Sequence, residues 1–349
     1  MWLINFWGKF FEKKRVIYID VIRVVAMMLV VLAHSCASRL SIRDGAFSWD
    51  VANGLVIITE IAVPLFFMIS GATILNSKKT RNVGYLFKHR LVRVVIPFLI
   101  WSVLSAFFIR VIQRTFEMHD FLKSVALIYH QPVLMAYWFI YPLLGLYLLS
   151  PLLKALVDNI DDKLMNYLLI LWIVTSIFLP NVVTSVPQQW SAYFQGYSML
   201  FITSSSSLGY FILGYKLTQA RHRQLNRTKV ALIIVLLLAI NIILGFLTDG
   251  NHLRYLNIIS NLIIPMIAAL CFTWLKSFET HYPTWLSKTI EFVAPLTYGV
   301  YLVHGLTIAV VEGLFGFHYF IPNFILSTVI SLIIIFILSK IPLIKKIML

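Results

Sequence analysis

Two residues in the first apolar segment of the chain, Arg23 and His34, have side chains and a spacing that suit chemistry inside a membrane. A charged side chain at membrane depth costs roughly 2.5 to 3.5 kcal/mol, so its presence indicates a functional site. The unperturbed pKa of imidazole lies near neutrality, which suits histidine to proton transfer. Eleven helical steps return to within about 20° of the same face and rise about 16 Å, so one helix stripe carries both groups.

Asp20 stands three residues before Arg23, a spacing at which two side chains share a helix face. We therefore expect an ion pair in the first turns of this helix. Two plainer interpretations remain open. The pair can serve only to orient the helix, and His34 can be no more than a hydrogen-bonded helix contact.

Arg90 and Arg93 form a second pair, one helical turn apart, where a lysine-rich loop runs into an apolar segment. Two guanidinium groups on one face suit a phosphate or pyrophosphate, which they can bind by bidentate hydrogen bonds. Ordinary anchoring of basic side chains against anionic lipid is the alternative.

Four further residues lie in or beside apolar segments and carry polar or aromatic groups. Glu60 is a buried ionisable group that needs a partner, and His304 falls in the middle of its segment. Trp138 opens the fourth segment and Tyr301 precedes His304 by three residues. Tryptophan and tyrosine near a membrane boundary are usually interfacial anchors.

Composition places these residues in a polytopic membrane protein. Apolar residues make up 60% of the 349 residues and charged residues 12%, and the mean hydropathy is +0.87, which excludes a soluble domain of this size. Apolar runs of about 20 residues predict an all-α bundle of about ten transmembrane helices. Residues 1–349 are expected to form one transmembrane domain with no appended soluble domain. The predicted spans are 16–37, 55–75, 91–112, 138–157, 164–180, 198–219, 229–248, 256–275, 291–311 and 321–341.

The net charge of +15 reflects membrane topology rather than nucleic-acid binding. Most of the 29 lysines and arginines fall in loops and tails on one side, which the positive-inside rule assigns to the cytoplasm together with both termini. The two cysteines lie in apolar spans and indicate no disulfide framework. The densest basic patches are Lys9–Arg15, Lys78–Arg93 and Lys216–Lys229, and Lys345 and Lys346 follow the last span.

The order of these segments resembles the membrane acyltransferase-3 family. Tyr18–Arg23 followed by His34 resembles the opening of the family, in which ten residues separate a basic residue from a histidine. Arg90–Arg93 resembles its Arg-x-x-Arg motif. Further segments fit the family in the same order, namely 63–71, 138–151, 209–215 and 298–304.

The resemblance implies transfer of an acyl group, most often acetyl, from cytoplasmic acyl-CoA to a hydroxyl of a cell-envelope polysaccharide or its lipid-linked precursor. It also implies a multi-pass protein of the bacterial inner (plasma) membrane. Trp49–Asn53, followed by Val63–Gly71, is similar to the stand-alone members that O-acetylate enterobacterial common antigen. Glu60 departs from that pattern, so the acceptor stays open.

Within the family, each candidate residue has an expected role. Arg90 and Arg93 would hold the phosphates of acetyl-CoA, and His34 would act as general base or acyl carrier. Arg23 would stabilise a phosphate or keep the entry open by pairing with Asp20. No metal is expected, because His34 and His304 lack a third ligand. The acceptor side would be lined by Glu60, Trp138, Tyr301 and His304.

A transporter, for instance a flippase of a lipid-linked saccharide, is the alternative function. Arg23, Glu60 and His34 would then line a polar path and relay protons across the bilayer. Such transporters often contain inverted repeats, and we detect none in this sequence. The oligomeric state is not predicted.

Overall fold

The computed structural model of the protein describes residues 16–185, 206–220, 226–248, 256–316, 319–342, 344 and 347. Some predicted features lie outside these residues. They are the basic patch Lys9–Arg15, part of the patch Lys216–Lys229, the pair Lys345 and Lys346, and positions 198–205 of the sixth predicted span.

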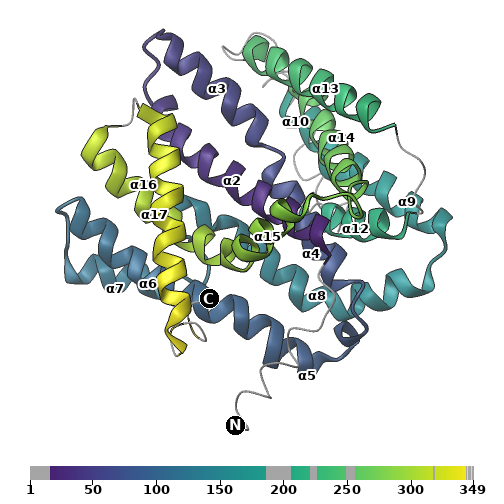
Figure 1. Cartoon of the computed structure of the whole chain (residues 1–349), viewed down its shortest axis with the longest axis horizontal. Helices are drawn as coiled ribbons and strands as arrows, with labels where there is room; N and C mark the ends of the chain where they lie inside the picture. Colours follow the sequence, from purple (N-terminus) through teal and green to yellow (C-terminus); the bar gives the residue numbers. More distant parts are fainter. Residues whose placement is uncertain are drawn as a thin grey trace.

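Every regular element in the described part of the chain is a helix (Figure 1). Nine helical segments in that part are long and apolar enough to cross a membrane, and α12 lies in the second half of the sixth predicted span. The predicted all-α polytopic bundle is thereby confirmed. The helices are α2 (Ile17–Leu40), α3 (Phe47–Thr59), α4 (Ala62–Ile74), α5 (Val83–Tyr85), α6 (Val92–Ile112), α7 (Met118–Leu127), α8 (Ile140–Asn159), α9 (Asp162–Trp172), α10 (Leu179–Ser185), α12 (Ser206–Gln219), α13 (Arg227–Thr248), α14 (Leu256–Lys276), α15 (Thr284–Val293), α16 (Thr297–Phe315) and α17 (Phe320–Lys340).

α2 is the helix around which the rest of the bundle is arranged. It contacts α3, α4, α14, α15, α16 and α17, and Figure 1 shows it crossing the middle of the molecule. α16 runs beside α2 in the same direction, because Val21 in the first turns of α2 shares a buried cluster with Ala294, just before α16, and His34 contacts His304 further along. The parallel arrangement brings two distant parts of the sequence to the same depth.

The second span is one apolar run in the sequence but two helices in the structure. α3 ends at Thr59 and α4 begins at Ala62, so Glu60 lies in the break. Pro64 has no backbone N–H to donate to the carbonyl four residues earlier, which belongs to Glu60. The break therefore follows from the proline and places a carboxyl group at the joint.

α4 and α12 are packed backbone against backbone. A Cβ atom added to Gly71 would lie 1.7 Å from the carbonyl oxygen of Phe211, and one added to Gly214 would lie 1.9 Å from that of Met68. Small residues let transmembrane helices approach this closely. The segments 63–71 and 209–215, which resemble the family, thus form one seam between two helices.

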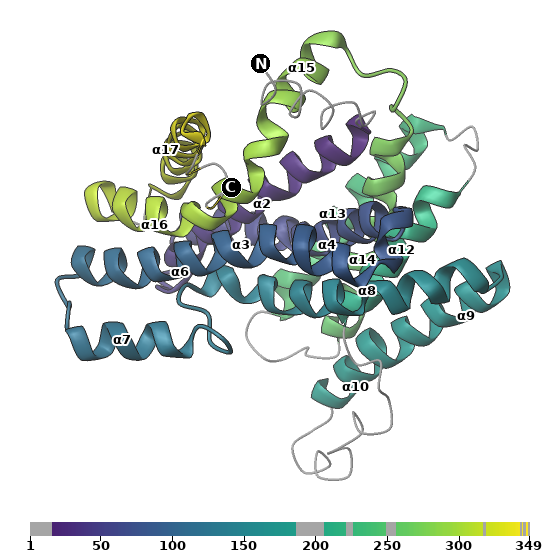
Figure 2. The ribbon, with the colours of Figure 1, turned by 90° about the horizontal axis from the view of Figure 1, so that it is seen from below.

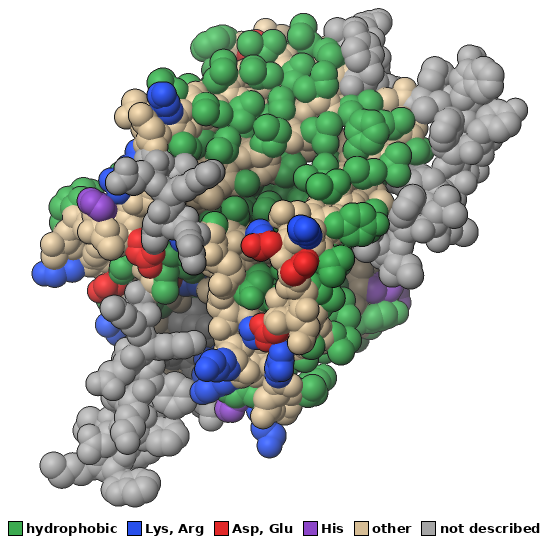
Figure 3. Space-filling view, turned by 90° about the vertical axis from the view of Figure 1, so that its right-hand side faces the viewer, with side chains coloured by type: hydrophobic (Ala, Val, Ile, Leu, Met, Phe, Trp, Pro, Cys, Tyr) green, Lys and Arg blue, Asp and Glu red, His purple; other side chains and the backbone are tan. Residues whose placement is uncertain are grey.

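The outer faces of the bundle are apolar. α13 buries few of its residues and exposes Leu232, Val235 and Leu236. In Figure 3 apolar side chains cover much of the visible face, and the acidic and basic side chains gather in one part of it. α7 lies beside α6 without a buried residue of its own (Figure 2). Such surfaces fit a hydrocarbon environment with charges kept near its edges.

Candidate active site

Two histidines from different helices meet inside the bundle. The rings of His34 on α2 and His304 on α16 have centroids 5.3 Å apart and an interplanar angle of 44°. His304 is fully buried, whereas His34 is half-buried. Over the described ranges, no group of three or more His, Cys, Asp or Glu side chains could hold a metal ion. The two imidazoles form a dyad at the contact between α2 and α16.

One hydrogen bond defines the tautomer of His304. Its Nδ1 lies 2.5 Å from the backbone oxygen of Tyr301, so Nδ1 carries the hydrogen and donates it. The other ring nitrogen, Nε2, is buried and has no hydrogen-bond partner among the described residues. In this tautomer Nε2 is an acceptor with a free lone pair, next to the ring of His34.

A pocket of about 180 Å³ lies between α2, α4, α6, α8 and α16. Arg23 lines it, and the remaining polar lining comes from hydroxyl groups. These belong to Ser70, Thr73, Tyr147, Thr297, Tyr298 and Tyr301, and the Tyr301 hydroxyl donates to the carbonyl of Ala136.

The directions of the helices order this lining along the pocket. On α16, which runs with α2, Thr297 comes before Tyr301. Tyr147 on α8 is within electrostatic range of Arg23, while Phe139, the residue immediately before α8, contacts Tyr301, so α8 runs the opposite way. The polar residues therefore gather at the Arg23 end, and the other end leads towards the histidines.

Aromatic rings close that other end. The ring centroids of Phe66, Phe139 and Tyr301 lie 5.6 to 6.4 Å from one another. The Tyr301 ring is also 5.6 Å from the ring of His304. His34 is not among the residues that line the pocket, but its ring is in contact with that of His304.

The ion pair expected at the start of α2 is present. Arg23 Nη1 lies 2.5 Å from Asp20 Oδ1, and Arg23 is partly exposed at the pocket wall. Asp20 thus holds the guanidinium at the entrance. An arginine that pairs with one carboxylate and is partly exposed can still bind an anionic group of a ligand.

The two arginines of the Arg-x-x-Arg motif have different surroundings. Arg90 is half-buried, donates to Thr80 Oγ1 at 2.7 Å and lies 5.8 Å from the ring of Tyr85. Arg93 is exposed, with no hydrogen-bond partner among the residues that the structure describes. Arg90 lies in a π-helical turn, Leu86–Leu91, whereas Arg93 lies in the α-helix that follows. Because Tyr147 is within electrostatic range of both Arg23 and Arg90, Arg90 belongs to the Arg23 end.

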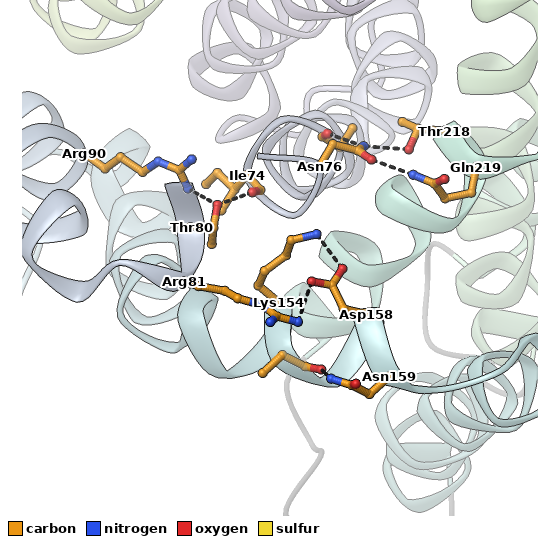
Figure 4. A network of polar contacts seen from close by, with 12 residues as sticks. Ile74, Asn76, Thr80, Arg81, Arg90, Lys154, Asp158, Asn159, Thr218 and Gln219 are labelled. Atoms are coloured by element: carbon orange, nitrogen blue, oxygen red, sulfur yellow. Dashed lines mark hydrogen bonds and ion pairs between the residues drawn. The ribbon is translucent and has the colours of Figure 1, made fainter. Parts of the chain in front are cut away.

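Other basic side chains at this end are committed to structural pairs (Figure 4). Asp158 accepts hydrogen bonds from Lys154 at 2.5 Å and from Arg81 at 2.9 Å. Asn76 joins the end of α4 to α12 through Thr218 and Gln219. Arg81 and Lys154 are therefore less available to a ligand than Arg90 and Arg93.

The remaining acceptor-side candidates are dispersed. Glu60 accepts a hydrogen bond from Asn241 of α13 at 3.3 Å, and Asn241 accepts one from Ser260 of α14 at 2.7 Å. Glu60 does not line the pocket. Trp138 is 45% exposed and touches Phe139, which does line it. The structure thus brings Tyr301 and His304 to His34, and leaves Glu60 in a separate polar cluster.

A polar contact beyond the histidines was not anticipated from the sequence. Ser38 donates to Glu312 Oε2 at 2.9 Å and so joins α2 to α16 one turn past His34. Glu312 Oε1, Asn323 Oδ1 and Ser327 Oγ are buried without a partner among the described residues. Glu312 directly follows the predicted span 291–311, and α16 extends to Phe315, so an acidic residue at the end of an apolar span was the signal that could have identified it.

The loop after α2 is also held by a buried charge. Arg39 is fully buried and donates to Ser48, to the carbonyl of Ile42 and to Asp44. The hydrogen bond from Arg39, and a second from the backbone N–H of Ala46, hold the pKa of Asp44 below its usual range. This loop fixes the end of α2 that carries His34.

Comparison with known families settles the class of this protein. The family model described as an acyltransferase domain matches residues 16–340, which is most of the chain. The protein belongs to the acyltransferase-3 family. No curated protein and no solved structure matches it. The resemblance inferred from the sequence is confirmed at the level of the family, a membrane acyltransferase, and the transporter alternative gains no support.

Proposed function

We propose that this acyltransferase moves an acetyl group from cytoplasmic acetyl-CoA to a hydroxyl of a cell-envelope polysaccharide or its lipid-linked precursor, in the bacterial inner membrane. The observation that carries the proposal is the pocket that runs from Arg23 to the aromatic rings beside the His34–His304 dyad. It offers an anionic donor a polar entrance, and its far end reaches Tyr301, whose ring contacts His304 of the dyad.

Acetyl-CoA would enter at the Arg23 end. Arg93 is exposed there and Arg90 is held at the ring of Tyr85, so both guanidinium groups could meet the phosphates of CoA. The pantetheine arm would then lie along the hydroxyl-lined part of the pocket. The rise of about 16 Å from Arg23 to His34 is comparable with the reach of that arm.

The chemistry moves one proton in two transfers, first to His34 and then to the leaving thiolate. His34 would take the proton of the acceptor hydroxyl as its oxygen attacks the thioester carbonyl. The C–S bond then breaks, and the thiolate takes that proton back from His34 to leave as free CoA. His304 Nε2, which has a free lone pair, would accept a hydrogen bond from protonated His34. An acetyl-imidazole on His34 is the variant of this route.

The acceptor would approach from the opposite end of the bundle. Ser38 and Glu312 lie there, and the loop before α3 places Trp49 against the end of α2 through a hydrogen bond to the carbonyl of Leu40. Trp49–Asn53 is the segment similar to the members that act on enterobacterial common antigen. That glycan is therefore the first acceptor to test.

The decisive experiment compares the wild type with His34→Ala in a reconstituted reaction. Purified protein is incubated with acetyl-labelled CoA and a membrane glycan extract, and both free CoA and labelled glycan are followed. We expect the variant to lose about 10²- to 10⁴-fold in rate. His119→Ala, an exposed histidine on α7, is the matched control and should transfer normally. Full activity in His34→Ala would refute the assigned role, and a wild type that neither binds nor consumes acetyl-CoA would refute the proposed function.

A further inference from the structure

Three aromatic rings form the end of the pocket that lies away from Arg23. Phe66 of α4, Phe139 at the start of α8 and Tyr301 of α16 come from three different elements, and their rings are in mutual contact. The polar lining lies at the other end, next to Arg23. A ligand whose polar part stays at the Arg23 end therefore meets the three aromatic rings with its inner end.

Hydrogen bonds and packed neighbours hold these rings in place. The hydroxyl of Tyr301 donates to the carbonyl of Ala136. Tyr137 donates to the carbonyl of Leu302 at 2.6 Å and shares a hydrogen bond with Ser105. The ring of Phe67 lies 4.7 Å from that of Phe139 on the buried side. To move outward, a ring would have to break buried hydrogen bonds or displace close-packed neighbours.

We propose that Phe66, Phe139 and Tyr301 measure the acyl group of the donor and restrict this enzyme to acetyl and similarly short groups. The inference rests on the proposed function, since it takes the pocket to be the path of the acyl-CoA. The ring of Tyr301 contacts that of His304, and the rings of Phe66 and Phe139 contact that of Tyr301. A thioester within reach of the dyad therefore has its acyl chain against these rings.

The reaction itself cannot make this selection. A thioester and a hydroxyl give an ester and a thiol, with the same bonds broken and formed, whatever the length of the chain. Selection must therefore come from the room that the walls leave. In an apolar pocket, each methylene added or removed changes discrimination by about 10- to 200-fold.

The test measures transfer from acetyl-, butyryl- and hexanoyl-CoA by the wild type and by Phe139→Ala and Phe66→Ala. We expect the wild type to use butyryl-CoA at least about ten-fold less well than acetyl-CoA. Each variant should reduce that preference at least about ten-fold, as removal of a ring makes room. Phe272→Ala is the control, because Phe272 is also fully buried but packs against Tyr18 outside the pocket.

A milder variant guards against loss of the fold. Phe66→Leu keeps an apolar side chain at a half-buried position and should shift the preference in the same direction by a smaller factor. Acetyl transfer by the wild type with an unchanged chain-length profile in all three pocket variants would overturn the inference and leave the proposed function intact. No transfer from any acyl-CoA by the folded wild type would instead overturn the proposed function.

Discussion

The contact between α2 and α16 and the contact between α4 and α12 are built by segments that resemble the same family, yet they differ in physical character. The first joins His34 to His304, whose Nε2 has no hydrogen-bond partner among the residues that the structure describes. The second joins Gly71 and Gly214 to opposing backbone, with no space for even one additional carbon. A family motif can therefore mark chemistry or close packing, and only its surroundings tell which.

The two contacts also depend on each other. α4 presents Gly71 to α12 and, on another part of its surface, Phe66 and Ser70 to the pocket. The seam thus fixes the distance of one pocket wall from the rest of the bundle. Interiors this closely packed transmit small displacements, so changes at the seam are expected to reach the pocket.

The largest effect should come from the seam. Gly71→Ala places a methyl group 1.7 Å from the oxygen of Phe211, so α4 and α12 must separate. We expect loss of the folded protein or a destabilisation of about 3 kcal/mol, measured by thermal unfolding in detergent. Gly145→Ala on α8, where nothing lies within 4 Å of the added carbon, is the control and should be neutral or slightly stabilising. Equal stability of the two variants would contradict the seam.

The dyad should respond in activity rather than in stability. His304→Gln keeps a polar side chain of similar reach but removes the imidazole that faces His34. We expect the fold to persist and the rate of acyl transfer to fall by about 10²-fold, at the lower end of the range for general acid–base catalysis. Rates are compared at saturating acetyl-CoA, with thermal unfolding as the check on the fold. A His304→Gln enzyme of normal rate would reduce this contact to packing, like that of α4 with α12.

At the entrance of the pocket a smaller effect is expected. Arg90→Ala removes one guanidinium from the proposed phosphate site and should raise the KM for acetyl-CoA by about ten-fold, because a hydrogen bond to a charged group contributes about 1.5 to 3 kcal/mol. The value of kcat should change less. Lys123→Ala, an exposed cation on α7, serves as the control. An unchanged KM in Arg90→Ala would assign this motif to anchoring against lipid.

The smallest effect concerns the loop that follows α2. Asp44 has a pKa held below its usual range by Arg39, so its ion pair stabilises the fold above the unfolded pKa of about 3.9 and is lost as the pH falls through the folded value. Asp44→Asn should therefore lower the melting temperature slightly at pH 7, and the difference should vanish in acid. A difference of equal size at both pH values would exclude the ion pair as its cause.

The sequence predicted the parts of the site that depend on neighbours along one helix. Asp20 and Arg23 pair as their spacing indicates, because helix geometry alone fixes which side chains share a face. Nine of the ten predicted spans coincide with helical segments of the described chain that are long and apolar enough to cross a membrane, since a bilayer requires about 20 apolar residues for each crossing. The second of these segments begins at Phe47 rather than at residue 55. By contrast, the sequence grouped Glu60 with His304 because both are ionisable residues in apolar segments. The structure instead places Glu60 with Asn241 and Ser260.

By itself, then, the sequence determined the class of the fold and the resemblance to the acyltransferase-3 family. Tertiary structure alone decided that His304 meets His34, that Ser38 meets Glu312 and that Gly71 abuts Phe211. The reason is physical. Every transmembrane helix satisfies the same hydrophobic requirement, so apolar length says where a helix crosses, whereas shape and small residues at each interface decide which helices touch.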